Sequence, residues 1–138
     1  MFKNSSTKQI RLKVTKTRHL VCRARINGLK AILLIDTGAS NSCIALSEKE
    51  KFNIKEKGNP FKASGAGKDK VEAVFGHKCN LILGRHTVGK HPFVLLDMQY
   101  INTALIRENT EPIDGILGAD FLKKNRALIN YGNNTLNL

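Results

Sequence analysis

One aspartate in this sequence is placed as a catalytic group would be. Asp36 ends an apolar run in the stretch LLIDTGAS, and Thr37, Gly38, Ala39 and Ser40 follow it directly. An apolar strand would hold the carboxylate rigidly, and a glycine at position 38 lets the backbone turn sharply beside it. The hydroxyls of Thr37 and Ser40 can fix such a loop by hydrogen bonds. The pattern indicates acid–base chemistry at Asp36.

Acid–base chemistry of this kind needs a second carboxylate. Two carboxylates in contact cannot both ionise, so they share a proton, and one acts as a base on water while the other acts as an acid toward a carbonyl. Asp114 precedes its apolar strand, and Asp97 is followed by Met-Gln-Tyr, which provides no bracing loop. Both are interpreted as turn or structural residues. Ser40 and Ser42 lack the context of a serine nucleophile.

Neither the histidines nor the cysteines are spaced as the ligands of a metal site usually are. We therefore expect no metal, and two-carboxylate chemistry requires no organic cofactor. The 3 cysteines contain no CxxC pair, which argues against a disulfide framework and for thiols in a reducing compartment. The residues concerned are His19, His77, His86, His91, Cys22, Cys43 and Cys79.

The chain shows no recognisable targeting or membrane-spanning segment. Its first residues, MFKNSSTKQIRLKV, contain no apolar core of signal-peptide length. No stretch approaches the ~20 apolar residues of a membrane span. These patterns predict a cytoplasmic protein with no membrane partner.

The formal net charge of +12 is the unusual bulk property of the chain. Such a charge can favour binding to nucleic acid, to a membrane surface or to an acidic partner. The basic residues nevertheless occur in short, scattered groups, as at 23–25, 49–51 and 123–126, without the interleaved aromatic residues of a base-stacking surface. A solvated basic surface is favoured, and nucleic acid stays an alternative partner.

The segments before Asp36 predict strands that deliver it. Residues 8–14 and 19–26 alternate apolar with basic side chains, which is typical of strands with one wet face. Asn27-Gly28 predicts a tight type I′ turn. Residues 29–35 are almost continuously apolar and predict a strand through the core that ends at Asp36.

The remaining segments predict a mostly β domain. Residues 47–54 suggest a short helix, and 59–76 suggest two strands around a glycine-rich tip. Residues 99–112 give a weak signal and are interpreted as a loop. A strand at Ile116-Leu117, a short helix from about Ala119 and a hairpin turning at 132–134 close the chain. Short strands without a βαβ rhythm favour a barrel or a sandwich.

The stretches LLIDTGAS at 33–40 and DGILGADFL at 114–122 resemble the two hallmarks of retropepsin-like aspartic proteases. Between them lies the glycine-rich tip, where that family has its flap. The resemblance extends from about Ile10 to Leu138. It implies a mostly β domain, a closed β-barrel or sandwich with a flap hairpin and one or two short helices, working as a two-fold homodimer. We expect a single domain over 1–138, with 1–8 as a loose N-terminal segment.

The same resemblance implies roles for individual residues. Asp36 corresponds to the catalytic aspartate, one per subunit, supported by the loop of Thr37, Gly38, Ala39 and Ser40. Thr37 would hydrogen-bond across the dyad to its mate, and the Gly38 amide would brace the carboxylates. The positions implied to form the flap and bind substrate are Ser64, Gly65, Ala66 and Gly67, and those implied to pack beside the catalytic loop are Ile116, Leu117 and Gly118.

The function that the resemblance implies is that of an aspartic endopeptidase. Asp36 of each of two subunits would activate a water molecule, and an extended polypeptide would bind between the loop and the flaps. The alternative is a dimer of the same fold that binds proteins or peptides with little or no proteolysis. Two departures from the family pattern bear on specificity and dimer stability, namely a more polar flap at 64–69 and a longer chain around 99–112.

Overall fold

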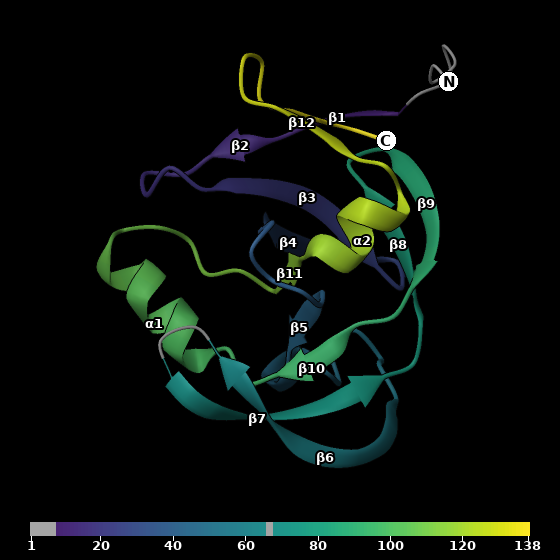
Figure 1. The fold of residues 1–138 in the computed structure, drawn as a ribbon, viewed down its shortest axis with the longest axis vertical. Coiled ribbons are helices and arrows are strands. Elements are labelled where there is room, and N and C mark those ends of the chain that lie inside the picture. The colour runs from purple at the N-terminus through teal and green to yellow at the C-terminus, as the bar shows by residue number, and fades with distance from the viewer. Residues whose placement is uncertain (1–7, 66–67) are drawn as a thin grey trace.

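The computed structural model describes residues 8–65 and 68–138 of the chain (Figure 1). Within these residues the chain is mostly β, with two α-helices, α1 (Gln99–Arg107) and α2 (Ala119–Lys124), and one 3-10 turn, η1 (Leu46–Glu48). The prediction of a mostly β domain is confirmed. The strands are β1 (Gln9–Arg11), β2 (Lys13–Val14), β3 (Leu20–Ile26), β4 (Leu29–Ile35), β5 (Cys43–Ala45), β6 (Glu56–Gly65), β7 (Lys68–Gly76), β8 (Cys79–Leu83), β9 (His86–His91), β10 (Val94–Leu96), β11 (Gly115–Leu117), β12 (Leu128–Asn130) and β13 (Thr135–Asn137).

The strands form two sheets. The larger has the order β6-β7-β10-β5-β11-β4-β3-β8-β9, with β2 paired to β3, and the smaller has the order β1-β13-β12. Figure 1 shows the smaller sheet covering one end of the molecule and the β6–β7 hairpin at the other end. Ile10 of β1 and Leu136 of β13 belong to the same buried cluster as Leu33 of β4, so the two sheets share one core.

The expected closed barrel is wrong. In the described residues the end strands β6 and β9 do not pair with each other, so the large sheet stays open. Its edges are protected in another way, because exposed lysines such as Lys62 on β6 and Lys90 on β9 discourage further strand pairing. Register shifts in the β6–β7 and β8–β9 ladders also bend these edge strands.

The β3–β4 hairpin forms as its sequence predicts. Asn27 and Gly28 take positive φ angles of 49° and 85°, as a type I′ turn requires. The Asn27 side chain also donates to the Phe52 carbonyl at 2.8 Å and accepts from the Asn80 N–H at 3.0 Å. These bonds fix the start of β4 and therefore the path of the chain toward Asp36.

Strand β4 is buried on both faces, although unequally. Ala31 and Leu33 lie in the main core, whereas Ile32 and Leu34 are half-buried on the opposite face. That second face carries a separate apolar cluster that includes Met98 at the start of α1. The continuous apolar run before Asp36 is thus explained by one core on each side of the strand.

The expected loop at Gln99–Pro112 is wrong in its first part, because residues Gln99–Arg107 form helix α1. The helix packs Ile101 and Leu105, one turn apart, on the second apolar cluster. In addition, both backbone groups of Ile113 bond the Asn102 side chain, with the Ile113 N–H donating at 2.8 Å and the Ile113 carbonyl accepting at 3.0 Å. Tertiary contacts therefore stabilise a helix whose local signal is weak.

The other short elements follow the sequence with one exception. Helix α2 begins at Ala119 and the C-terminal β12–β13 hairpin forms, as predicted. The helix expected at 47–54 is wrong, because only the turn η1 and further turns occur there. Phe52 and Ile54 are drawn into the core instead, with exposed fractions of 0% and 5%. Burial of these two side chains overrides the helical pattern.

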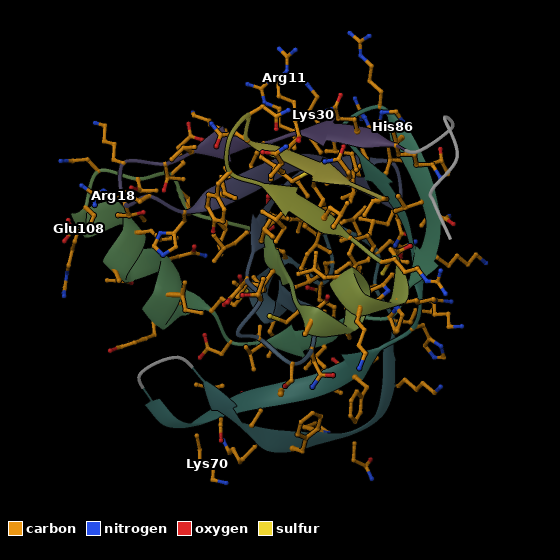
Figure 2. All side chains as sticks on the ribbon, turned by 45° about the horizontal axis from the view of Figure 1, so that its top comes forward. Arg11, Arg18, Lys30, Lys70, His86 and Glu108 are labelled. Atoms are coloured by element: carbon orange, nitrogen blue, oxygen red, sulfur yellow. The ribbon has the colours of Figure 1, made fainter. Side chains whose placement is uncertain are left out.

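Basic side chains point outward from several parts of the molecule. Figure 2 shows Arg11, Arg18, Lys30 and Lys70 extending into solvent from β1, the β2–β3 turn, β4 and β7. All four are exposed. Their spread agrees with the solvated basic surface that the sequence favours.

Candidate active site

The backbone of Asp36 is fixed by the strand beside it. Strands β4 and β11 run parallel, with Ile35 opposite Leu117. Just past the ladder, the Asp36 N–H donates to the Leu117 carbonyl at 3.0 Å. The Asp36 side chain is half-buried at this strand end. A carboxylate is therefore held at a defined place and stays open to solvent on one side.

The loop after Asp36 turns back on the carboxylate. The Gly38 N–H donates to Asp36 Oδ1 at 2.9 Å, and the Ala39 N–H donates to the Asp36 carbonyl at 3.2 Å. A Cβ atom at position 38 would lie 3.3 Å from Asp36 Oδ1, so glycine permits this close approach. Thr37 and Ser40 are exposed, and their hydroxyls make no hydrogen bond within the described residues. Within the described residues the backbone, and not these hydroxyls, fixes the loop.

The segment Ile116-Leu117-Gly118 lies against the loop. Ile116 is buried in the second apolar cluster, against which Ala39 also packs. A Cβ atom at Gly118 would lie 2.5 Å from the Ala39 carbonyl oxygen, so only glycine fits there. The next residue, Ala119, donates its N–H to the same oxygen at 2.7 Å. The two stretches that the sequence analysis singled out thus meet in space.

A hydrogen-bonded network behind the loop was missed by sequence reasoning. Asp120 Oδ1 accepts from the Ser42 N–H at 2.9 Å and from the Ser42 hydroxyl at 2.7 Å. Ser42 Oγ in turn accepts from the Gly118 N–H at 2.9 Å. Asp120 Oδ2 lies 3.1 Å from His91 Nε2. These side chains come from distant parts of the chain, so no local spacing could reveal that they meet.

The environment of this network shifts two pKa values. Burial would raise the pKa of Asp120, but the hydrogen bonds from Ser42, from the Phe121 N–H and from His91 hold it below its usual value. Burial lowers the pKa of His91, and the attraction of Asp120 only partly offsets this effect. At neutral pH an ionised Asp120 therefore accepts hydrogen bonds from neutral partners.

The rival carboxylates have structural roles. Asp114 Oδ2 accepts from the Ile32 N–H at 2.8 Å, and its Oδ1 lies 3.9 Å from Lys51 Nζ. Asp97 Oδ1 accepts from the Gln99 N–H at the start of α1 at 3.0 Å.

No group of three or more His, Cys, Asp or Glu side chains suited to a metal occurs in the described part of the chain. No described helix is long and apolar enough to cross a membrane.

Two of the expected flap residues, Ser64 and Gly65, belong to the β6–β7 hairpin. Ser64 is exposed near the end of β6, and Gly65 pairs with Lys68 at the last rung of the ladder. Ala66 and Gly67 lie outside the described residues. A hollow of about 330 Å³ separates β7 from helix α1, with Val71 on one wall and Arg107 on the other. The hairpin and α1 therefore lie side by side, as Figure 1 also shows.

Comparison with known proteins agrees with this geometry. The family model for aspartyl proteases matches residues 22–121, from β3 through the start of α2. The chain is also 30% identical over 97 residues to the retrovirus-related Pol polyprotein from transposon 412 of Drosophila melanogaster. That match covers 70% of this chain and spans only 7% of the polyprotein.

Two solved structures share the fold. The retroviral protease-like domain of Ddi1 from Leishmania major superimposes with a TM-score of 0.62 at 20% identity, covering 86% of each chain. A retropepsin-like aspartic protease from Rickettsia conorii gives a TM-score of 0.61 at 15% identity, covering 98% of this chain and 100% of the other. The fold is thus that of the retropepsins. The chain belongs to the retropepsin-like aspartic protease family.

Proposed function

We propose that this chain is an aspartic endopeptidase whose active site forms from two copies. The supporting observation is that the Asp36 carboxylate, which bonds the Gly38 N–H, makes no contact with a second carboxylate among the described residues. Two other carboxylates in the described chain are occupied elsewhere, since Asp114 accepts from the Ile32 N–H and Asp120 accepts from Ser42. The chemistry needs two carboxylates, and a two-fold dimer supplies the second from another Asp36.

In the proposed reaction the two Asp36 carboxylates share one proton. The ionised carboxylate removes a proton from a water molecule, whose oxygen attacks the peptide carbonyl carbon. The protonated carboxyl group gives its proton to the carbonyl oxygen, which produces a tetrahedral diol. The carboxyl group that took its proton from water then gives that proton to the peptide nitrogen, while the other carboxylate takes a proton from one hydroxyl of the diol. The C–N bond breaks, the carboxylic acid and the amine leave, and the pair again holds one shared proton. The reaction needs only the two carboxylates and water.

The loop residues have supporting roles in this proposal. The Gly38 N–H, which already bonds Asp36 Oδ1, would hold each carboxylate in place. The Thr37 hydroxyl, which is exposed and makes no hydrogen bond among the described residues, would bond across the two-fold axis to the other subunit. Ala39 would keep the loop seated on the apolar cluster, and Ser40 would line the cleft beside it.

The substrate class that fits this site is an extended polypeptide. Strands β6 and β7 pair as a long hairpin. The residues that the sequence analysis assigned to the flap, Ser64, Gly65, Ala66 and Gly67, would close over the substrate. A peptide lying between the hairpin and the Asp36 loop would bond both through its backbone, as strand-like ligands do. Closure would also exclude water from the reacting carbonyl.

The proposal is tested by cleavage of a peptide library between about pH 4 and pH 7, the range in which a carboxylate pair can share a proton. Wild type should cleave, and Asp36→Asn should not. Asp114→Asn is the matched control, because it removes a carboxylate of the same chain that has a structural bond. Equal cleavage by wild type and Asp36→Asn would refute the proposal.

The alternative function is peptide or protein binding by a dimer of the same fold. The solved structure of the protease-like domain of Ddi1 shares this fold at 20% identity, which leaves the activity of the chain open. Binding without turnover predicts that wild type and Asp36→Asn retain the same library peptides equally well on an affinity column. Cleavage by wild type alone would exclude it.

A further inference from the structure

His91 is buried at the end of β9 with no role in the chemistry proposed above. Its exposed fraction is 5%. The ring makes edge-on contacts with Phe93 and Phe121, at centroid distances of 5.3 and 5.2 Å. Its only polar side-chain contact among the described residues is Asp120, 3.1 Å from Nε2. Burial of a polar ring costs free energy unless the ring is hydrogen-bonded, so the contact with Asp120 is the one that stabilises His91 in this position.

The directions of the hydrogen bonds can be assigned along the whole network. An ionised Asp120 can only accept, so His91 must carry its proton on Nε2 and donate to Oδ2. The Ser42 hydroxyl donates to Oδ1 and accepts from the Gly118 N–H. The Ser42 N–H, the Ser42 hydroxyl and the His91 Nε2–H therefore all donate to one carboxylate, and among the described residues His91 is the only side chain that bonds its Oδ2.

The network meets the Asp36 loop from two sides. Ser42 lies six positions after Asp36, where the loop enters β5. Gly118, on the other side, leaves no room for a side chain beside the Ala39 carbonyl oxygen. A rotation of the Asp120 carboxylate would release both Ser42 and Gly118, and it would therefore free the loop at both contacts.

We propose that His91 is a positioning residue for the Asp36 loop, because its Nε2–H holds Asp120 in the orientation that fixes Ser42 and Gly118 against that loop. The inference rests on the proposed function for its effect on catalysis. Its effect on the loop itself is independent of activity. His91 does not touch the reacting atoms in this account, and it acts only through Asp120.

Burial and the charged groups around His91 make the stability of this network depend on pH. Asp120 and Lys124 of α2 and Lys78 before β8 face the ring, and the Cys79 thiol lies across the β8–β9 ladder. Burial, together with the two lysines, keeps the pKa of His91 below its usual value against the attraction of Asp120. Cys79 stays a neutral thiol because burial raises its pKa. The neutral ring is thus the native form, and acid works against it.

Proton linkage determines how the stability contributed by His91 changes with pH. A histidine whose pKa is lowered in the folded state contributes its full stability above the unfolded pKa, and this contribution is lost as the pH falls toward the folded pKa. The closed network, in which His91 is buried and neutral, is therefore most stable above about pH 6.5, the ordinary histidine pKa, and loses stability as the pH falls below it. The acid limb of the activity profile should reflect this loss.

The test compares three variants. His91→Leu removes the donor while keeping an apolar side chain of similar size. His91→Gln keeps an N–H at about the distance of Nε2 from the backbone but cannot titrate. His77→Leu is the matched control, because His77 is exposed and its side chain makes no hydrogen bond among the described residues. The readouts are kcat and KM against pH, and amide hydrogen exchange at Ser42 and Gly118.

In the His91→Leu variant the amide hydrogens of Ser42 and Gly118 should exchange faster than in wild type. Its kcat should fall about tenfold to a hundredfold while KM changes little, as expected for a misplaced catalytic group. His91→Gln should restore kcat and exchange protection and should extend activity to lower pH. His77→Leu should behave as wild type.

Two results would overturn the proposal. One is exchange at Ser42 and Gly118 in His91→Leu that equals that of wild type. The other is a His91→Gln variant with the wild-type acid limb. If wild type and all variants cleave nothing, the proposed function fails, and the exchange data alone then decide the role of His91.

Discussion

Replacement of Gly118 by alanine tests how tightly the two halves of the site are joined. The new Cβ would lie 2.5 Å from the Ala39 carbonyl oxygen and 3.1 Å from the Asn41 backbone. Ordinary contact begins at 3.4 Å, so the loop after Asp36 must retreat by about 0.9 Å. The retreat also breaks the bond from the Ala119 N–H to the Ala39 carbonyl, which is 2.7 Å long.

The expected cost is substantial for stability and for activity. Overpacking of a buried site costs ~1–3 kcal/mol and loss of one backbone hydrogen bond ~1 kcal/mol, so the free energy of unfolding should fall by about 2–4 kcal/mol. A displacement of nearly 1 Å at the Asp36 loop should reduce kcat by about a hundredfold. Urea unfolding followed by far-UV circular dichroism measures the first quantity, because the chain contains no tryptophan.

Gly115→Ala is the matched control for this variant. Its Cβ would lie 2.4 Å from the Cys43 carbonyl oxygen, which belongs to β5 and not to the Asp36 loop. Gly115→Ala should therefore lose similar stability but less of kcat in the remaining folded protein. A Gly118→Ala variant with wild-type stability would show that Gly118 and Ala39 do not pack together, and the reasoning would fail.

Three further predictions concern other contacts. Asn102→Ala should lower the free energy of unfolding by about 1–3 kcal/mol, because it leaves both backbone groups of Ile113 unpaired, and urea unfolding would measure this loss. Cys22 and Cys43 should resist alkylation at pH 8 until the chain unfolds, since burial raises the pKa of each thiol to about 12; rapid labelling of the folded protein would contradict this. Stability contributed by ionised Asp120 should persist above its usual pKa of 3.8 and disappear as the pH falls below it, because its folded pKa is lowered. Unfolding curves of wild type and Asp120→Asn should therefore converge in acid, and a constant difference would count against the assigned bonds.

The sequence predicts those parts of the fold that depend on local pattern. Alternating residues place β1 and β3, and Asn27-Gly28 places the turn before β4. The apolar run through Ile35 identifies the strand that delivers Asp36. In each case neighbouring residues determine the backbone conformation, so a short window contains the information.

The features that the sequence does not predict depend on distant contacts. Helix α1 has a weak local pattern, and its bonds from Asn102 to Ile113 form only once the chain has folded. The open sheet follows from how the edge strands are protected, which periodicity does not reveal. The network of Ser42, His91 and Asp120 joins three distant parts of the chain, and each residue alone has an ordinary context in the sequence.

The central claim is that one active site requires Asp36 from two chains. It is tested most directly by measuring cleavage after wild type is mixed and equilibrated with inactive Asp36→Asn. With the variant in about tenfold excess, nearly every wild-type chain enters a mixed dimer, so cleavage per wild-type chain should fall to about a tenth. Cleavage per wild-type chain that stays unchanged at every ratio, while labelled subunits are seen to exchange, would contradict the account.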